Sequence, residues 1–240
     1  MGAKASILFI AGIILGLKIG LSSSPAFAQE SGGGGSKENL DLPVDAAGRE
    51  EEEEAPEIVI FYGQQFEGDG IFFCLDRSET MSQGRRWKTC QKEVVKSILQ
   101  FSEKVQFGLV FFDATLVKFP STGRPAEATP TMKAAAQAMV MSMHIGSGTC
   151  SKEALLAALQ FANLATVKRR IIFYLSDGGQ TCRGADPGQY GKQCLSEVRA
   201  RNTSGVKINS ICVGGPTPED ESWMKTLAAQ NDGQYTRVVN

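Results

Sequence analysis

Three oxygen-bearing side chains stand at alternate positions directly after a short apolar run. The run is residues 71–75, and Asp76, Ser78 and Thr80 follow it. An aromatic-rich apolar run that no charge interrupts is typical of a parallel strand buried on both faces. The helix-like pattern after Gly84 places these three residues in the loop at the carboxyl end of that strand, where open α/β sheets bind their ligands. A carboxylate and two hydroxyls in such a loop indicate a hard cation held by oxygen atoms.

Two further positions repeat this arrangement. Thr149 stands just before a predicted helix, and Asp177 directly follows a second buried strand, residues 170–176. The carboxyl ends of neighbouring parallel strands face the same side of a sheet, so Asp76 and Asp177 are expected to flank one crevice, with Thr149 arriving from a loop beside it. Mg²⁺ takes oxygen ligands in a near-octahedral shell and usually retains water. The predicted ligands would orient Mg²⁺, or alternatively Mn²⁺ or Ca²⁺, without closing its shell, so the ion could accept another carboxylate.

Strand-like and helix-like segments alternate from residue 57 onward. We expect strands at residues 58–62, 71–75, 105–112, 115–119, 170–176, 206–213 and 234–239, and helices at about 83–101, 131–143, from 151 and from 218. This alternation predicts an α/β fold, a doubly wound, Rossmann-like and mostly parallel sheet with helices on both faces. The two strands joined around Asp113 and Ala114 are expected to form an antiparallel hairpin, which gives the sheet one antiparallel edge strand.

Local signals define several boundaries within this pattern. Residues 63–70 are expected to form a polar turn between the first two strands. Ser151 can cap the third helix with its hydroxyl group. Thr217 is a capping residue for the last helix, which has Pro218 in its first position and acidic residues in its first turn. Gly233 is expected to end that helix.

Residues 1–28 have the pattern of a signal peptide. Lys4 supplies a positive start, residues 5–17 are apolar, and residues 26–28 (Ala-Phe-Ala) match a signal-peptidase site. The alternative is an uncleaved membrane anchor, but the apolar stretch of 13 residues is shorter than the roughly 20 that span a bilayer. The pattern therefore predicts an exported protein, located in the periplasm, outside the cell or at the cell envelope.

The composition of the remaining chain separates a linker from a domain. Residues 29–56 contain a glycine run and a block of five successive glutamates, and such a segment is expected to be a disordered linker. Residues 57–240 remain for a single domain. The formal net charge is -1 and the basic residues are scattered, so the chain lacks the basic excess of a protein that binds nucleic acid. Contact with a membrane is expected only through the signal peptide or an uncleaved anchor.

The set Asp76-x-Ser78-x-Thr80 with Thr149 and Asp177 resembles the metal-ion-dependent adhesion site of von Willebrand factor type A domains. The resemblance covers residues 57–240 and is strongest in three segments, residues 73–78, 175–179 and 223–239. Residues 61–63, which precede the first core strand, are similar to the corresponding segment in exported bacterial members. Two positions depart from the family pattern: Thr80 replaces the usual serine, and Glu79 stands where a small residue is commonest.

The resemblance implies a division of roles at the site. Ser78, Thr80 and Thr149 would bind the metal directly, whereas Asp76 and Asp177 would act largely through water. It also implies a non-enzymatic function, the divalent-metal-dependent binding of a protein partner that presents a carboxylate. Within the chain, the polar loop at residues 178–194 is the predicted place of contact with that partner.

Three other functions are weighed against this one. A haloacid-dehalogenase-like phosphatase would use Asp76 as its nucleophile, but Ser78 stands where its general acid should be, and residues 178–182 lack its second acid. A serine or cysteine hydrolase would have only His144 as an imidazole base, and the chain contains no Gly-x-Ser-x-Gly elbow. A purely structural domain with a vestigial metal site remains the third alternative.

Six cysteines in a chain with an export signal predict disulfide bonds, although six allow fifteen pairings. Cys182 and Cys194 bracket a polar loop and are the easiest pair to close. Cys150 is also expected in a disulfide, whereas Cys74 and Cys90 are expected to be core thiols. A single histidine and the absence of a Cys-x-x-Cys motif argue against a zinc site.

Overall fold

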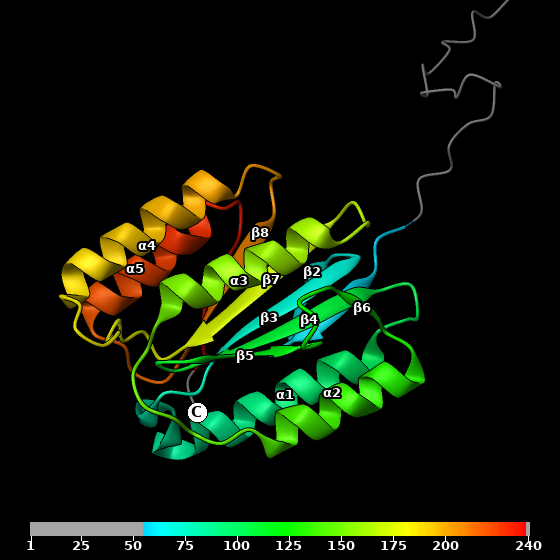
Figure 1. The fold of residues 1–240 in the computed structure, drawn as a ribbon, viewed down its shortest axis with the longest axis horizontal. Helices are drawn as coiled ribbons and strands as arrows, with labels where there is room; N and C mark the ends of the chain where they lie inside the picture. The colour runs from blue at the N-terminus through cyan, green and yellow to red at the C-terminus, as the bar shows by residue number, and fades with distance from the viewer. Residues whose placement is uncertain (1–54, 239–240) are drawn as a thin grey trace, which may run out of the picture. The chain divides into compact units, whose positions relative to one another are not determined.

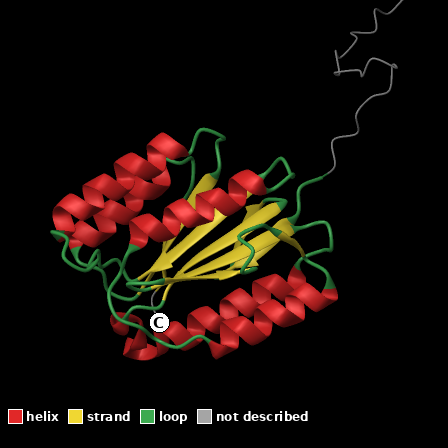
Figure 2. Cartoon of the chain, viewed as in Figure 1, coloured by secondary structure: helices red, strands yellow, loops and turns green. Residues whose placement is uncertain are grey.

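A mixed β-sheet lies between two helical layers in the computed structural model, which describes residues 55–238 (Figures 1 and 2). The strand order is β5-β4-β3-β7-β8-β9, with β6 also paired to β4. These strands are β3 (Gly70–Asp76), β4 (Gln106–Phe112), β5 (Leu116–Phe119), β6 (Ala126–Glu127), β7 (Arg170–Ser176), β8 (Lys207–Val213) and β9 (Tyr235–Val238). Strands β5 and β6 run antiparallel to β4, and the other pairs are parallel. The predicted fold class, with its antiparallel edge strand, is confirmed.

Five α-helices cover the two faces of this sheet. They are α1 (Arg86–Gln100), α2 (Pro130–Ser142), α3 (Ser151–Leu164), α4 (Pro187–Arg201) and α5 (Pro218–Ala229). Helices α1 and α2 lie on one face, and α3, α4 and α5 lie on the other (Figure 1). Each face has its own hydrophobic core, and both cores include side chains of β3 and β7.

The apolar run of the central strand follows from this layering. All seven residues of β3 are buried. Phe73 and Leu75 belong to the core under α1 and α2, whereas Phe72 and Cys74 belong to the core under α3, α4 and α5. A strand that is buried on both faces has no position for a solvated side chain, which is why its sequence does not alternate.

The segment before β3 differs from the expectation. The predicted first strand forms as β1 (Ile58–Phe61), but the expected polar turn contains a second strand, β2 (Gln64–Glu67), and the two form a separate antiparallel sheet. The two-residue loop between them has φ of 48° at Tyr62 and 75° at Gly63. Positive φ at both central residues is the requirement of the tight turn that best matches the twist of a hairpin.

Several helix boundaries also differ from the sequence prediction. The helix expected from residue 83 begins at Arg86, because residues 79–85 form a 3₁₀ segment that ends in left-handed backbone at Gly84 and Arg85. Helix α4 was absent from the prediction, and its first half occupies part of the loop predicted for partner contact. That loop therefore ends at Asp186, which caps α4 by accepting a hydrogen bond from the Gln189 amide.

The predicted capping residues have different outcomes. Thr217 caps α5, since its side chain accepts a hydrogen bond from the Asp220 amide. The amide of Gly233 donates to the carbonyl of Ala228 at 3.0 Å, so this glycine does follow the end of α5. The prediction that Ser151 caps α3 is wrong. Cys150 is the capping position, and the Ser151 hydroxyl lies 2.8 Å from the Tyr174 hydroxyl in the interior.

The predicted signal peptide at residues 1–28, and all but the last two residues of the predicted linker at 29–56, lie outside the described residues. In residues 55–238, no helix has both the length and the apolar character that crossing a membrane requires.

Phe173 provides a test of the core that carries the hairpin. Its ring contacts those of Phe61, Phe66 and Phe73, with centroids 4.9, 4.7 and 5.5 Å away. We expect Phe173→Ala to lower the free energy of unfolding, measured with urea, by about 3–5 kcal/mol. Leu164→Ala is the control, because Leu164 is 46% exposed at the end of α3, and it should change stability by less than about 0.5 kcal/mol. A small effect of both substitutions would contradict the packing described here.

Candidate metal centre

The first predicted ligand group begins with Asp76, the last residue of β3. Its side chain is fully buried. Oδ1 accepts a hydrogen bond from the Ser78 amide at 2.7 Å, and Oδ2 accepts one from the Ser176 hydroxyl at 2.6 Å. Ser176 ends the neighbouring parallel strand, since Leu75 and Leu175 are partners in the pairing of β3 with β7. The predicted adjacency of the two strand ends is therefore confirmed.

Ser78 and Thr80 stand where the chain leaves β3 and enters the 3₁₀ segment. Their hydroxyl oxygens lie 3.2 Å from each other. Ser78 is only 3% exposed, whereas Thr80 is exposed. The structure thus brings together two of the three hydroxyls that the sequence predicts as direct ligands, and it leaves the outer one accessible from solvent.

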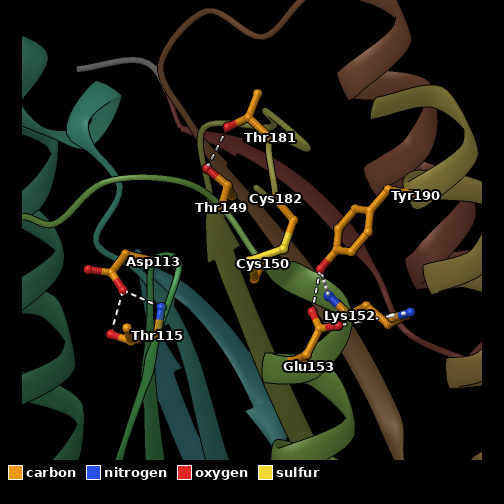
Figure 3. The surroundings of a disulfide bond; sticks show 9 residues. All are labelled: Asp113, Thr115, Thr149, Cys150, Lys152, Glu153, Thr181, Cys182 and Tyr190. Carbon is orange, nitrogen blue, oxygen red and sulfur yellow. Dashed lines mark hydrogen bonds and ion pairs between the residues drawn. A yellow bond between two sulfur atoms is a disulfide. The ribbon is translucent and has the colours of Figure 1, made fainter. Parts of the chain in front are cut away.

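Thr149 reaches this end of the sheet on the segment before α3. It is 3% exposed, and its amide donates to the carbonyl of Thr181 at 3.2 Å. The Thr181 hydroxyl donates to that of Thr149 at 3.3 Å, as Figure 3 shows. Thr181 lies four residues beyond Asp177, so the loops that carry two of the predicted site residues are joined directly.

A disulfide bond between Cys150 and Cys182 joins the same two loops covalently (Figure 3). The predicted pair Cys182–Cys194 is wrong, because Cys194 is carried by α4 into the core as a buried free thiol. The expectation that Cys150 forms a disulfide is confirmed. Cys74 and Cys90 are buried free thiols, as predicted.

A largely buried ion pair that the sequence analysis did not identify holds the loop before Thr149. Asp113 follows β4, and its Oδ2 lies 3.0 Å from Nη2 of Arg77. Its Oδ1 accepts hydrogen bonds from the amide and hydroxyl of Thr115, at 2.6 and 2.7 Å. Gly146 packs directly on this carboxylate, since a β-carbon at that position would lie 1.6 Å from Oδ2. Only glycine fits there, which explains one of the two glycines before Thr149.

The carboxylate of Asp177 forms an ion pair with an arginine. Its Oδ2 is 2.8 Å from Nη1 of Arg86, the first residue of α1. The same nitrogen donates to the carbonyl of Thr80 at 3.3 Å. Sequence analysis could not identify Arg86, because it is separated from Asp177 by 91 positions. Asp76, Ser78, Thr80, Arg86 and Asp177 thus form one continuous set of contacts.

Burial gives Asp76 unusual electrostatics. Desolvation raises the pKa of its carboxyl from 3.8 to about 7; hydrogen bonds from Ser176 and Ser78 oppose the shift, and the charge of Asp177 adds to it. Both neighbours that bond to the carboxylate are neutral. A buried carboxylate of this kind is stabilised by either a proton or a cation.

The donor set matches a hard divalent cation. Asp76, Ser78, Thr80, Thr149 and Asp177 offer oxygen atoms only, which is the ligand chemistry of Mg²⁺, Mn²⁺ and Ca²⁺. Among residues 55–238, softer ligands gather at Cys150, Glu153 and Cys182, whose ligand atoms lie within 4.8 Å of one another. The sulfur atoms of the two cysteines are joined in the disulfide and do not offer thiolate ligands.

Comparison with known families agrees with this arrangement. Residues 71–180, which run from β3 to the loop after β7, match the sequence model of the von Willebrand factor type A domain. The chain carries a von Willebrand factor type A domain. A curated relative, inter-alpha-trypsin inhibitor heavy chain H4 from Homo sapiens, is 23% identical over 175 residues, which cover 70% of this chain and 18% of that protein. The chain therefore spans less than a fifth of that relative.

Solved structures show the same fold at low sequence identity. A von Willebrand factor type A protein from Catenulispora acidiphila has a TM-score of 0.63 at 15% identity, with 79% of this chain and 47% of that chain covered. The pilus adhesin SpaC from Lactobacillus rhamnosus GG has a TM-score of 0.58 at 13% identity, covering 73% and 28%. The PilB minor pilin from Streptococcus sanguinis has a TM-score of 0.58 at 12% identity, covering 74% and 59%.

The disulfide of this type A domain should contribute to its stability. The two cysteines are separated by 32 positions. A cross-link of that length restricts the unfolded chain, so the double substitution Cys150→Ser with Cys182→Ser should lower the free energy of unfolding by about 2–4 kcal/mol. Urea unfolding measures this loss, and reduction of the wild-type protein should reproduce it. A double variant as stable as the oxidised wild type would contradict the prediction.

The raised pKa of Asp76 predicts how stability depends on pH in a chelating buffer. Between pH 3.8 and about 7 the folded protein retains a proton that the unfolded chain has lost. The protonated carboxyl therefore makes its full contribution to the free energy of unfolding below the unfolded pKa of 3.8. That contribution is lost as pH rises through the folded pKa of about 7, by at most about 1.4 kcal/mol per pH unit. Urea unfolding of Asp76→Asn across this range should lack that component.

Glu103→Gln is the control for this measurement. It neutralises an exposed acidic residue far along the chain from β3, so its pH profile should follow that of the wild type. Parallel profiles for Asp76→Asn and the wild type would mean that the buried carboxyl titrates normally.

Proposed function

We propose that this type A domain binds a protein partner through a divalent cation. Ser78, Thr80 and Thr149 would hold the cation directly, and Asp76 and Asp177 would support it. The observation that carries the proposal is the buried Asp76 carboxylate, which bonds only to neutral groups at the carboxyl end of the central strand. The Ser78 and Thr80 hydroxyls beside it supply further oxygen ligands.

A bound Mg²⁺ would supply a coordination position that accepts a carboxylate oxygen of the partner. The residues of this chain would hold the position ready. Thr80 lies in the 3₁₀ segment and Ser78 directly precedes it. The Cys150–Cys182 disulfide fixes Thr149 relative to the loop after Asp177. The exposed Thr80 marks the accessible side of the site. Residues 183–186 are exposed on the loop after Asp177, and they are our candidates for further contact with the partner.

We assign a binding role rather than a catalytic one. Phosphatase chemistry on Asp76 would need an acid near Ser78 to protonate the leaving group. The Ser78 hydroxyl instead contacts Thr80, and the acidic residue between them, Glu79, is exposed. One structural neighbour is named a pilus adhesin, which indicates attachment and supports the same role for this chain.

The proposed setting is outside the cytoplasm. Residues 1–28 would act as the signal peptide and 29–56 as a flexible acidic tether for the domain. The mature protein would then work in the periplasm, outside the cell or at the envelope. A disulfide beside the proposed site is consistent with an oxidising compartment.

The decisive test is metal binding by the domain and its loss on removal of one hydroxyl. Isothermal titration of the wild type with MgCl₂ or MnCl₂ should show a single site. Thr80→Val keeps the shape of the side chain but removes its ligand oxygen, so it should weaken the affinity at least about tenfold, or ~1.4 kcal/mol. Ser82→Ala is the matched control, because Ser82 is an exposed hydroxyl in the same 3₁₀ segment.

The partner is sought with the same variants. Capture from extracts of the source cells should require magnesium, be abolished by chelator, and be lost with Thr80→Val but not with Ser82→Ala. The proposal would be overturned if Thr80→Val bound metal as tightly as the wild type does. It would also be overturned if chelator left the set of captured proteins unchanged. An unaltered melting temperature on addition of either metal would favour the purely structural alternative.

A further inference from the structure

Arg86 occupies a specific place beside the candidate metal centre. Its Nη1 lies 2.8 Å from Oδ2 of Asp177 and 3.3 Å from the carbonyl oxygen of Thr80. The side chains of Arg86 and Asp177 are 18% and 9% exposed, so the pair is largely shielded from water. A charged residue of the chain is therefore held between two predicted members of the site.

The surrounding backbone is shaped for this guanidinium. Gly214 follows β8 with φ of 108°, and a β-carbon there would lie 2.4 Å from Nε and 2.5 Å from Cζ of Arg86. Any larger residue at this position would displace the arginine. The ends of β7 and β8 and the start of α1 thus converge on one side chain.

The position of Arg86 in its helix favours the contact with Asp177. Arg86 is the first residue of α1, and the amino end of a helix carries partial positive charge that disfavours a cation. The carboxylate of Asp177 opposes that effect at close range. The neighbouring Arg85 carries the same charge but is exposed.

We propose that Arg86 is a built-in competitor of the metal, which sets the affinity of the site and its preference for an acidic partner. This inference rests on the proposed function. Without metal, the guanidinium neutralises Asp177. With metal bound, Arg86 adds one positive charge close to the ion. That charge weakens binding of the ion and strengthens attraction for a carboxylate of the partner.

The test is a titration of four proteins with MnCl₂: wild type, Arg86→Gln, Arg86→Lys and Arg85→Gln. We expect Arg86→Gln to bind Mn²⁺ at least about fivefold more tightly than the wild type, because Asp177 is released to the ion. Arg86→Lys keeps the charge but loses the planar fork, so its affinity should lie between the two. Arg85→Gln removes an equal charge one position away and should stay within about twofold of the wild type.

The outcomes separate this inference from the function on which it rests. If both proteins bind metal and Arg86→Gln binds it no more tightly than the wild type, the inference is overturned and the proposed function stands. Metal binding by Arg86→Gln but not by the wild type would overturn the proposed function, and with it the inference, because the arginine would then replace the ion. No binding by either protein would overturn both. Equal tightening in Arg85→Gln would show a general charge effect and reject a specific role for Arg86.

Glutarate provides a second readout of the same idea. In Mn²⁺-saturated protein, this soluble dicarboxylate should bind Arg86→Gln at least about threefold more weakly than the wild type, since one positive charge beside the ion is gone. Metal affinity and carboxylate affinity should therefore change in opposite directions. A variant that merely loosens the fold would weaken both, and this result would count against the inference.

Discussion

The interaction on which the rest of the site depends is the burial of the Asp76 carboxylate at the end of the central strand. In-register pairing of β3 with β7 places this carboxylate against the Ser176 hydroxyl, and the layers of helices on both faces exclude water from it. A buried carboxylate is costly unless hydrogen bonds and a counter-charge stabilise it. Hydrogen bonds from neutral groups are present, and burial still raises its pKa to about 7. A positive charge beside the Asp76 carboxylate would therefore stabilise its ionised form.

The remaining residues of the candidate site are held by different kinds of contact. The 3₁₀ segment after β3 positions Ser78 and Thr80 locally, whereas Thr149 arrives on a long loop and needs restraint from outside its own element. The Cys150–Cys182 disulfide supplies one restraint, and the Asp113 carboxylate packed under Gly146 supplies another. A binding site must be held close to its working geometry by such supporting contacts. These contacts hold the segment that carries Thr149 against the loop after β7 and the end of β4.

Sequence reasoning succeeded where the physical cause was local. Apolar runs buried on both faces identified β3 and β7, and the polar residues after them do lie at the carboxyl ends of these two neighbouring strands. It failed where the cause was spatial or the pattern weak. Strand β2 has one buried residue, Phe66, and reads as a turn. Helix α4 has few apolar residues, so its cap at Asp186 was overlooked, and with it the burial of Cys194. The contact of Arg86 with Asp177 joins segments 91 positions apart.

The distribution of the cysteines connects the site with the predicted export. Four of the six are buried free thiols, and burial raises the pKa of each, for Cys212 to about 11. Buried thiols with raised pKa form little of the reactive thiolate. The pair that does form a bond lies on the two loops next to Thr149 and Asp177. Oxidation of this chain therefore joins the two site loops and leaves the core thiols reduced.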